Sequence, residues 1–291
     1  MPTIRTSGFA DLRTLLVLGR VSNLPTIWSN CLAGWILGGG GNLSRLLWLG
    51  LGATYLYLGG TFLNDAFDAQ FDQQHRPERP IPSGKAGLET VWKWGLSWLG
   101  LGMLCLMFLE KTTFLLAVLL ALNILVYDAI HKIFAFSPVF IAGCRFLLVL
   151  LAASAAEDGV TGLSLWSALV LAAYVFGLSC LARKESLKTA VRYWPCAFLA
   201  APLVLALIVN RGEYRLRGWL LCGLLGCWVV NSLRHTYGSP QRHIPRSVAG
   251  LLAGIVLVDW MAVGGGTFPD ALVFVGLFVL TLLFQQLIPA T

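Results

Sequence analysis

Long apolar runs, separated by short polar stretches, fill most of the 291-residue chain. Runs of about 18 apolar residues are typical of helices that cross a membrane. We therefore predict an all-α, polytopic transmembrane bundle of nine to ten spans, formed by a single domain over residues 1–291. The ten predicted spans are 23–37, 46–63, 94–109, 114–130, 138–156, 163–182, 194–209, 219–233, 248–263 and 271–288.

The composition supports this class, since 57% of the residues are hydrophobic and 12% are charged. A soluble protein of this length needs a more polar surface. A basic segment with a short interfacial helix over 9–18 is expected before the first span, and its mixed polarity does not predict a cleavable signal peptide. The seven cysteines lie in or beside apolar runs without metal-type spacing, so we interpret them as small buried residues without disulfides.

The basic residues also predict how the chain is oriented. Ten spans place both termini on one side, which then holds 15 of the 21 Lys and Arg residues, whereas the other side holds five and Arg145 lies within a span. Cytoplasmic loops carry an excess of Lys and Arg, so we expect the richer side to face the cytoplasm, in the cell membrane. The net charge of +7 follows this topology and does not predict nucleic acid as a partner.

The second predicted span ends in an unusual acidic segment. Asp65, Asp68 and Asp72 recur at offsets of 0, 3 and 7, which places them on one face of a helix. Neighbouring carboxylates repel one another, and Mg²⁺, which also bridges to phosphate oxygens, relieves that repulsion. Arg76 and Arg79 follow with planar donors suited to phosphate. A solvated helix end is the alternative, but three carboxylates at a helix C-terminus oppose the helix dipole.

This segment resembles the first aspartate-rich motif of the UbiA-type intramembrane prenyltransferases. Eight positions within 21 residues carry the resemblance: Asn64, Asp65, Asp68, Asp72, Arg76, Arg79, Pro80 and Gly84. Weaker similarity extends to Arg20 and Asn23 at the first span and to Tyr127 and Lys132 after the fourth, and so covers about the first 190 residues. The resemblance implies that a prenyl diphosphate is bound through Mg²⁺ and that its prenyl group passes to an acceptor, commonly an aromatic ring.

The chain departs from that family after the sixth span, where a second aspartate-rich motif is expected. It has Arg183, Lys184, Glu185 and Ser186 there, and of these only Glu185 can bind a metal directly. The basic residues either replace the second Mg²⁺ by contacting diphosphate themselves, or the site has lost part of its chemistry. A third interpretation is that these basic residues anchor the helix end at the cytoplasmic membrane surface.

Several other polar groups carry open alternatives. Tyr127 and Lys132 are either an interfacial anchor pair or site residues, and Asp128 between them is a possible extra carboxylate. Arg145 and Asp259 are the charges deepest in apolar runs, and they either pair across the bundle or belong to a site. The four histidines lie in predicted cytoplasmic loops without metal spacing, and none is assigned as a ligand.

We predict an integral-membrane prenyltransferase whose cavity opens to the cytoplasmic face, with Mg²⁺ as cofactor and a prenyl diphosphate, a lipophilic acceptor and the lipid bilayer as partners. The predicted catalytic residues are Asp65, Asp68, Asp72 and Tyr127. The predicted metal ligands are Asn64, Asp65, Asp68, Asp72 and Glu185, and the predicted substrate-binding residues are Arg20, Asn23, Asn64, Arg76, Arg79, Lys132, Arg183 and Lys184. The alternatives are a prenyl-lipid binding or transport protein, an enzyme acting on polyprenyl phosphate, and a structural membrane subunit.

Overall fold

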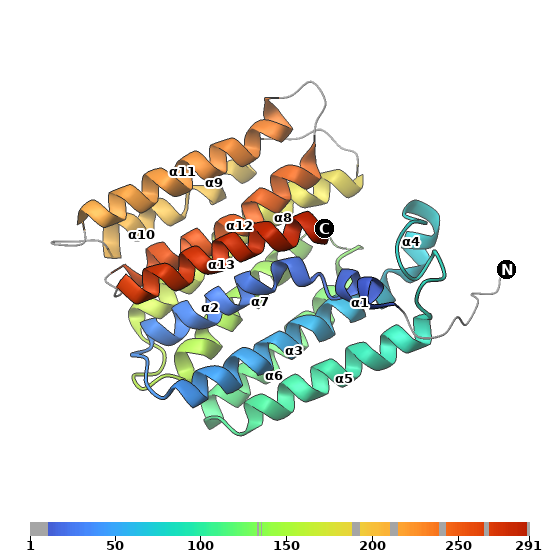
Figure 1. The fold of residues 1–291 in the computed structure, drawn as a ribbon, viewed down its shortest axis with the longest axis horizontal. Coiled ribbons are helices and arrows are strands. Elements are labelled where there is room, and N and C mark those ends of the chain that lie inside the picture. The colour runs from blue at the N-terminus through green and yellow to red at the C-terminus, as the bar shows by residue number, and fades with distance from the viewer. Residues whose placement is uncertain are drawn as a thin grey trace.

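The computed structural model describes residues 11–132, 134, 136–187, 193–209, 215–238, 243–264 and 268–289, with the side chains of 184–187 and 208–209 left out. Its described part is helical (Figure 1), and the bounds of the elements are α1 Leu12–Leu18, η1 Val21–Asn23, α2 Leu24–Leu37, α3 Leu43–Phe67, α4 Ala69–His75, α5 Leu88–Met107, α6 Lys111–Ile130, α7 Ser137–Ser154, α8 Gly162–Leu187, α9 Pro195–Leu199, α10 Pro202–Val209, α11 Arg215–Tyr237, α12 Ile244–Val263 and α13 Phe268–Leu287.

Each of the ten predicted spans corresponds to helix, and seven of the described helices are long and apolar enough to cross a membrane. These seven are α3, α6, α7, α8, α11, α12 and α13. The other three regions differ for visible reasons. Helix α2 has 14 residues, α5 carries Glu89 and Lys93 near its start, and the seventh region is divided into α9 and α10 just before Pro202.

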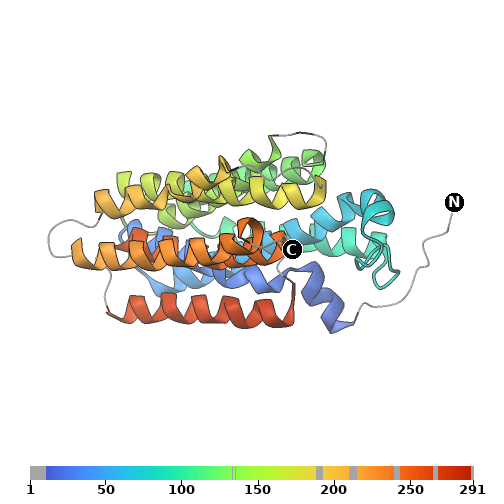
Figure 2. The same cartoon turned by 90° about the horizontal axis from the view of Figure 1, so that it is seen from above.

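The long helices run side by side and form a bundle (Figures 1 and 2). Helices α2 and α12 lie inside it, where α2 packs against α7 and α12 packs against α2, α8 and α11. Helix α13 lies along an outer edge (Figure 2). The end of α13 returns to the end of the bundle where α1 and α4 lie, and there the Ser22 hydroxyl donates to the carbonyl of Pro289 (Figure 1). The two ends of the described chain therefore meet at one end of the bundle, as predicted.

Small residues let pairs of helices approach closely. Gly34 and Gly38 of α2 face the backbone of α7, and a Cβ on Gly34 would lie 2.5 Å from the carbonyl oxygen of Val149. Helices α3 and α5 meet in the same way at Gly59 and Gly95. Close contacts of this kind are typical of helix pairs in membranes, where dispersion contacts replace the hydrophobic effect as the driving force.

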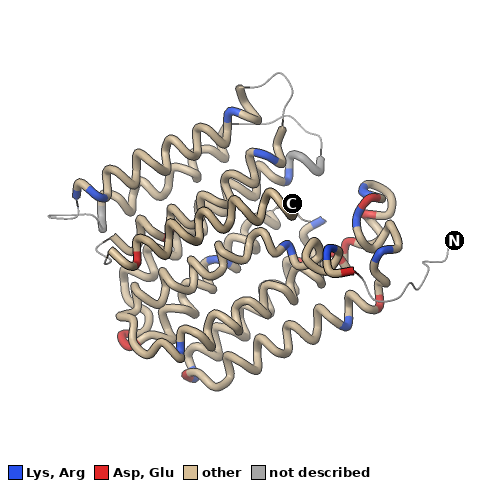
Figure 3. The backbone as a smooth tube through the Cα atoms, in the orientation of Figure 1, with Lys and Arg blue, Asp and Glu red and all other residues tan. Residues whose placement is uncertain are grey.

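Charged residues lie at both ends of the bundle, and the larger group lies at the end that carries α4 (Figure 3). Between the two ends the bundle is mostly apolar, with Arg145 and Asp259 as buried exceptions. All seven cysteines are free, as predicted. Four are buried, Cys144 and Cys196 are half-buried and Cys227 is exposed, so the prediction that all of them are buried is wrong for these three.

Candidate functional site

The acidic segment lies at a break between two helices. Helix α3 ends at Phe67, Asp68 caps it, and α4 begins at Ala69, so the three carboxylates do not follow one continuous helix. The backbone amide of Asp72 donates to the carbonyl of Asp68 at 2.8 Å, so Asp68 both ends α3 and belongs to the first turn of α4. Asp65, Asp68 and Asp72 remain 6%, 3% and 1% exposed. Three carboxylates buried this deeply require compensation.

Basic side chains supply that compensation. The Asp65 carboxylate accepts from Arg20 at 2.8 Å and from Arg79 at 3.1 Å, and Arg79 also contacts Asp72 at 3.2 Å. Asp68 accepts from Lys132 at 3.1 Å. Residues from three separate parts of the chain therefore neutralise the acidic segment, and this explains why the carboxylates can lie away from solvent.

The carboxylates differ in how readily they ionise. Burial opposes the ionisation of Asp68, but the hydrogen bond from His131 and the charge of Lys132 outweigh it and lower its pKa. Burial dominates at Asp72 and raises its pKa even though Arg79 lies beside it. Asp68 therefore keeps its negative charge more readily than Asp72 does.

His131 joins this site although the sequence analysis assigned it no role. Its Nδ1 lies 3.2 Å from the carbonyl oxygens of Tyr127 and Asp128, and its Nε2 lies 3.1 Å from Asp68. Both ring nitrogens therefore face acceptors, and only the doubly protonated ring donates to all of them. The sequence feature that could have identified His131 is its position three residues after Asp128 and next to Lys132, at the end of the same helix.

A cavity of about 380 Å³ opens beside the acidic segment. Of the predicted site residues, those that line it are Arg20, Asn23, Asn64, Asp68, Arg76, Arg79, Tyr127, Lys132 and Arg183. Asp65 and Asp72 are not among its lining residues, and both contact Arg79. Deeper in, the walls are mainly apolar, from Ile27, Leu56, Leu120, Leu148 and Ile255 among others. The cavity thus has a charged mouth and an oily interior.

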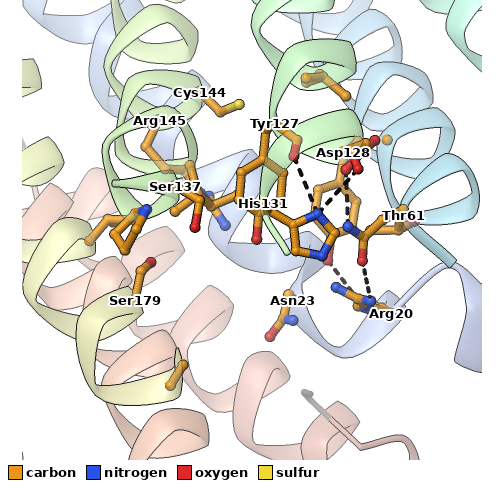
Figure 4. Close-up of a pocket in the computed structure, with 18 of the residues that line it drawn as sticks. Arg20, Asn23, Thr61, Tyr127, Asp128, His131, Ser137, Cys144, Arg145 and Ser179 are labelled. Carbon is orange, nitrogen blue, oxygen red and sulfur yellow. Dashed lines mark hydrogen bonds between the residues drawn. The ribbon is translucent and has the colours of Figure 1, made fainter. Parts of the chain in front are cut away.

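Arg183 lies on the wall of this cavity that α7 and α8 form. It donates to the carbonyl of Phe134 and, at 2.8 Å, to the hydroxyl of Ser137. Figure 4 shows Ser137 and Ser179 on the wall opposite Asp128 and Arg20. The side chains of Lys184 and Glu185 lie outside the described residues, so their predicted roles stay predictions.

Tyr127 and Asn64 connect the mouth to the interior. The Tyr127 ring stacks on His131 with the ring centroids 5.0 Å apart. The amide oxygen of Asn64 accepts from Arg20 at 2.8 Å, and its nitrogen donates to Asp128 at 3.0 Å. These contacts fix the orientation of Asn64, and its predicted role as a metal ligand stays a prediction.

The two deep charges are linked by an amide between them. Arg145 donates to the side-chain oxygen of Asn30 at 2.6 Å and to the hydroxyl of Thr26 at 3.0 Å. Asn30 in turn donates to Asp259 at 2.6 Å, and the hydroxyl of Ser29 donates to the same oxygen of Asp259. Arg145 and Asp259 are therefore joined through Asn30, and Arg145 also lines the cavity, so its predicted role in a site stays a prediction.

The donor set fits a hard divalent cation. Within the described ranges no three His, Cys, Asp or Glu side chains form a ready-made metal cage. Mg²⁺ does not need one, because it binds through one or two carboxylates and keeps several waters. Oδ1 of Asp72 is buried without a hydrogen-bond partner in the described part of the chain. Asp68 and Asp72, with Asp65 beside them, are therefore the residues suited to hold Mg²⁺, in competition with Arg79 and Lys132.

Comparisons with known proteins agree with this arrangement. The model of the UbiA prenyltransferase family matches residues 23–243. Digeranylgeranylglyceryl phosphate synthase of Ignicoccus hospitalis is 39% identical over 93 residues, which are 32% of this chain and 30% of that protein. The enzyme of the same name from Methanoregula boonei is 36% identical over 70 residues, which are 24% of this chain and 25% of the relative. The matches thus span less than a third of these relatives.

Two solved structures share the fold. The apo structure of a UbiA homologue from Aeropyrum pernix K1 has a TM-score of 0.65 at 13% identity, covering 84% of this chain and 97% of that one. A structure concerned with digeranylgeranylglyceryl phosphate synthase in membranes has a TM-score of 0.58 at 18% identity, covering 87% and 98%. At these identities the likeness shows a common helical architecture.

Proposed function

The chain belongs to the UbiA prenyltransferase family, and on that premise we propose that it transfers a prenyl group from a prenyl diphosphate to a lipophilic acceptor. Residues 1–291 would act as a single domain that spans the membrane several times. We further propose that it lies in the cytoplasmic membrane with the charged mouth of its cavity facing the cytoplasm, where the positive-inside rule places the basic end.

The observation that carries this proposal is the combination of a charged mouth and an apolar interior in one cavity. A prenyl diphosphate has the matching two halves, a polyanionic head and an oily tail. The head would lie among Arg76, Arg79, Lys132 and Arg183 beside the acidic segment, and the tail would extend between α3, α6 and α7. A structural membrane subunit has no need of this cavity or of the charges at its mouth.

The residues of the mouth would act on the leaving group. When bound at Asp68 and Asp72, Mg²⁺ supplies positive charge that stabilises the departing diphosphate. Arg79 and Lys132 would hold those carboxylates in place and donate to phosphate oxygens. Arg183 would donate to phosphate oxygens from the facing wall. Ile27, Leu120 and Leu148 exclude water, which would otherwise quench an allylic cation. Tyr127 presents an aromatic ring at the junction of mouth and interior.

The names of the relatives refine the choice of substrates. The relatives from Ignicoccus hospitalis and Methanoregula boonei are both named for a product that contains geranylgeranyl and glyceryl phosphate groups. We therefore propose geranylgeranyl diphosphate as the first donor to test and a prenylated glycerol phosphate, alongside aromatic acceptors, as the first acceptor.

The test is turnover by the full chain in lipid nanodiscs with labelled geranylgeranyl diphosphate, Mg²⁺ and a panel of acceptors. Asp68→Asn should lower product formation by about a hundredfold or more, since it removes a charge that positions the leaving-group machinery. The matched control is Asp158→Asn, an exposed carboxyl at the far end of α7, which should leave the rate unchanged. Binding of the diphosphate without its release would instead support a binding or transport protein.

A further inference from the structure

Asp128 is a buried carboxylate that the proposed mechanism does not use. It lies in the last turn of α6, is 4% exposed and lines the cavity. Its Oδ1 accepts from Asn64 at 3.0 Å, whereas its Oδ2 is buried and has no hydrogen-bond partner in the described part of the chain. A buried acceptor without a partner destabilises the folded state, because it has lost its hydrogen bonds to water without gaining others. Such a group in a cavity wall points to a ligand that supplies the missing donor.

The neighbouring basic side chains contact other groups. Arg20 donates to Asp65 and Asn64, and Lys132 and His131 contact Asp68. Asp128 is linked to these charges through Asn64, which receives a hydrogen bond from Arg20 and passes one on to Oδ1. This chain of hydrogen bonds fixes the orientation of the carboxylate, and it leaves Oδ2 without a partner in the described part of the chain.

The position of Asp128 along α6 places it between the two halves of the cavity. One and two turns deeper on the same helix, Ile124 and Leu120 line the apolar interior. One turn in the other direction, His131 and Lys132 contact Asp68 at the mouth. A prenyl diphosphate with its head at the mouth and its tail in the interior has its allylic carbon at this junction. The atom that attacks the allylic carbon must come to the same place.

We propose that Asp128 binds the nucleophilic hydroxyl of the acceptor, and that the acceptor is therefore a lipophilic molecule whose reacting atom is an O–H oxygen. This inference rests on the proposed function and names the acceptor class for it. A carboxylate is a strong partner for a hydroxyl because the hydrogen bond is charge-assisted. The bond between the allylic carbon and the diphosphate oxygen breaks and its electron pair leaves with diphosphate. The acceptor oxygen forms the new C–O bond, and its proton passes to Oδ2 of Asp128.

The experiment compares Asp128→Asn and Asp128→Glu with the wild-type protein and with the control Asp158→Asn, all as full chains in nanodiscs. Three quantities are measured: Mg²⁺-dependent binding of inorganic pyrophosphate, the melting temperature, and the kcat and KM for a hydroxyl acceptor. The panel pairs each hydroxyl acceptor with its methyl ether and adds an acceptor that reacts at an aromatic carbon.

We expect Asp128→Asn to bind pyrophosphate within about twofold of the wild-type affinity and to form ether product at least about tenfold more slowly, a difference of roughly 1.4 kcal/mol in activation free energy. The KM for the acceptor should rise and the KM for the prenyl diphosphate should not. Asp128→Glu should recover part of the rate, because it restores an anionic acceptor, and the methyl ethers should not react.

Three results would overturn the inference. Equal loss of pyrophosphate binding and turnover in Asp128→Asn would make Asp128 a metal or diphosphate ligand. An unchanged rate with hydroxyl acceptors, or wild-type transfer confined to aromatic carbon, would remove the assigned role while leaving the proposed function intact. Failure of the wild-type protein to prenylate any acceptor, despite Mg²⁺-dependent pyrophosphate binding, would instead refute both. If Asp128→Asn melts below the assay temperature, Asp128→Glu provides the comparison.

Discussion

Asp65 and Asp72 share the guanidinium of Arg79, so one side chain compensates two buried carboxylates. Replacing it in Arg79→Gln leaves both with reduced compensation, and a divalent cation then becomes the best substitute. We expect the variant to melt at a lower temperature than the wild-type protein in EDTA and to gain more from added Mg²⁺, because ligand binding stabilises the folded state in proportion to its affinity.

Melting curves of both proteins in EDTA and in a Mg²⁺ series measure this difference. Arg45→Gln is the matched control, since Arg45 forms an exposed ion pair with Glu110 outside the acidic segment. An equal Mg²⁺ response in wild type and Arg79→Gln would show that the cation does not compete with Arg79 for these carboxylates.

Arg145 and Asp259 allow a second prediction for single residues. They are joined through Asn30, so the loss of one charge leaves the other buried without compensation. Breaking a buried pair costs about 3–5 kcal/mol, whereas replacing both partners by apolar groups is often neutral. We therefore expect Arg145→Met and Asp259→Leu each to lower stability strongly, and the double variant to be more stable than the sum of the two effects predicts.

A double-mutant cycle based on denaturation in mixed micelles gives the coupling free energy. A coupling above about 1 kcal/mol between residues that do not touch would confirm transmission through Asn30. Strict additivity would instead mean that the two charges are stabilised independently.

At the scale of the elements, the contact between α3 and α5 positions the acidic segment. Gly59 lies between the two helices, and a Cβ there would come within 2.8 Å of the backbone nitrogen of Leu99. Gly59→Leu must therefore push α5 away from α3, whose last turn carries Asp65 and whose end is capped by Asp68. Overpacking of this kind costs about 1–3 kcal/mol or more, and we expect lower stability together with weaker Mg²⁺-dependent pyrophosphate binding.

The same helix provides the control for this substitution. Gly50 has open space around its Cβ position, so Gly50→Leu makes the same chemical change without a clash. Leucine is a better helix former than glycine by roughly 0.5–1 kcal/mol, and this variant should be at least as stable as the wild-type protein. Equal melting temperatures for the two variants would contradict the close α3–α5 contact.

The helices also show how much of the structure could be predicted from the sequence. Hydropathy located all ten predicted spans because apolar length is a local property. It did not predict the restart of the helix at Asp68, since residues 61–75 contain neither proline nor glycine. It also missed His131, whose contact with Asp68 depends on how α6 packs against the end of α3. Motif spacing located Asp68, Arg79 and Lys132, whereas the hydrogen bond from Asn64 that makes Asp128 distinctive exists only in the folded bundle.

At the scale of the whole molecule, the distribution of charge predicts which end faces the cytoplasm. Most of the basic residues lie at the end of the bundle that carries α4 (Figure 3), and the ends of α3, α6 and α8 bring the predicted site to the same place. The positive-inside rule assigns that end to the cytoplasm. The Gly39–Asn42 turn, at the other end of α3, should then face the opposite side of the membrane.

Two exposed serines report on this orientation, Ser83 in the segment between α4 and α5 and Ser44 at the start of α3. Each is replaced by cysteine in a Cys227→Ser background, because Cys227 is the exposed native thiol among the described residues. A membrane-impermeant maleimide applied to intact cells should label Ser44→Cys directly and Ser83→Cys only after the membrane is opened. The reverse pattern would place the acidic segment outside the cell. Prenyl diphosphates are charged molecules that do not cross a bilayer unaided, so a site on the outer face would have to draw its donor from outside the cell, and the proposed function would lose its cytoplasmic supply of substrate.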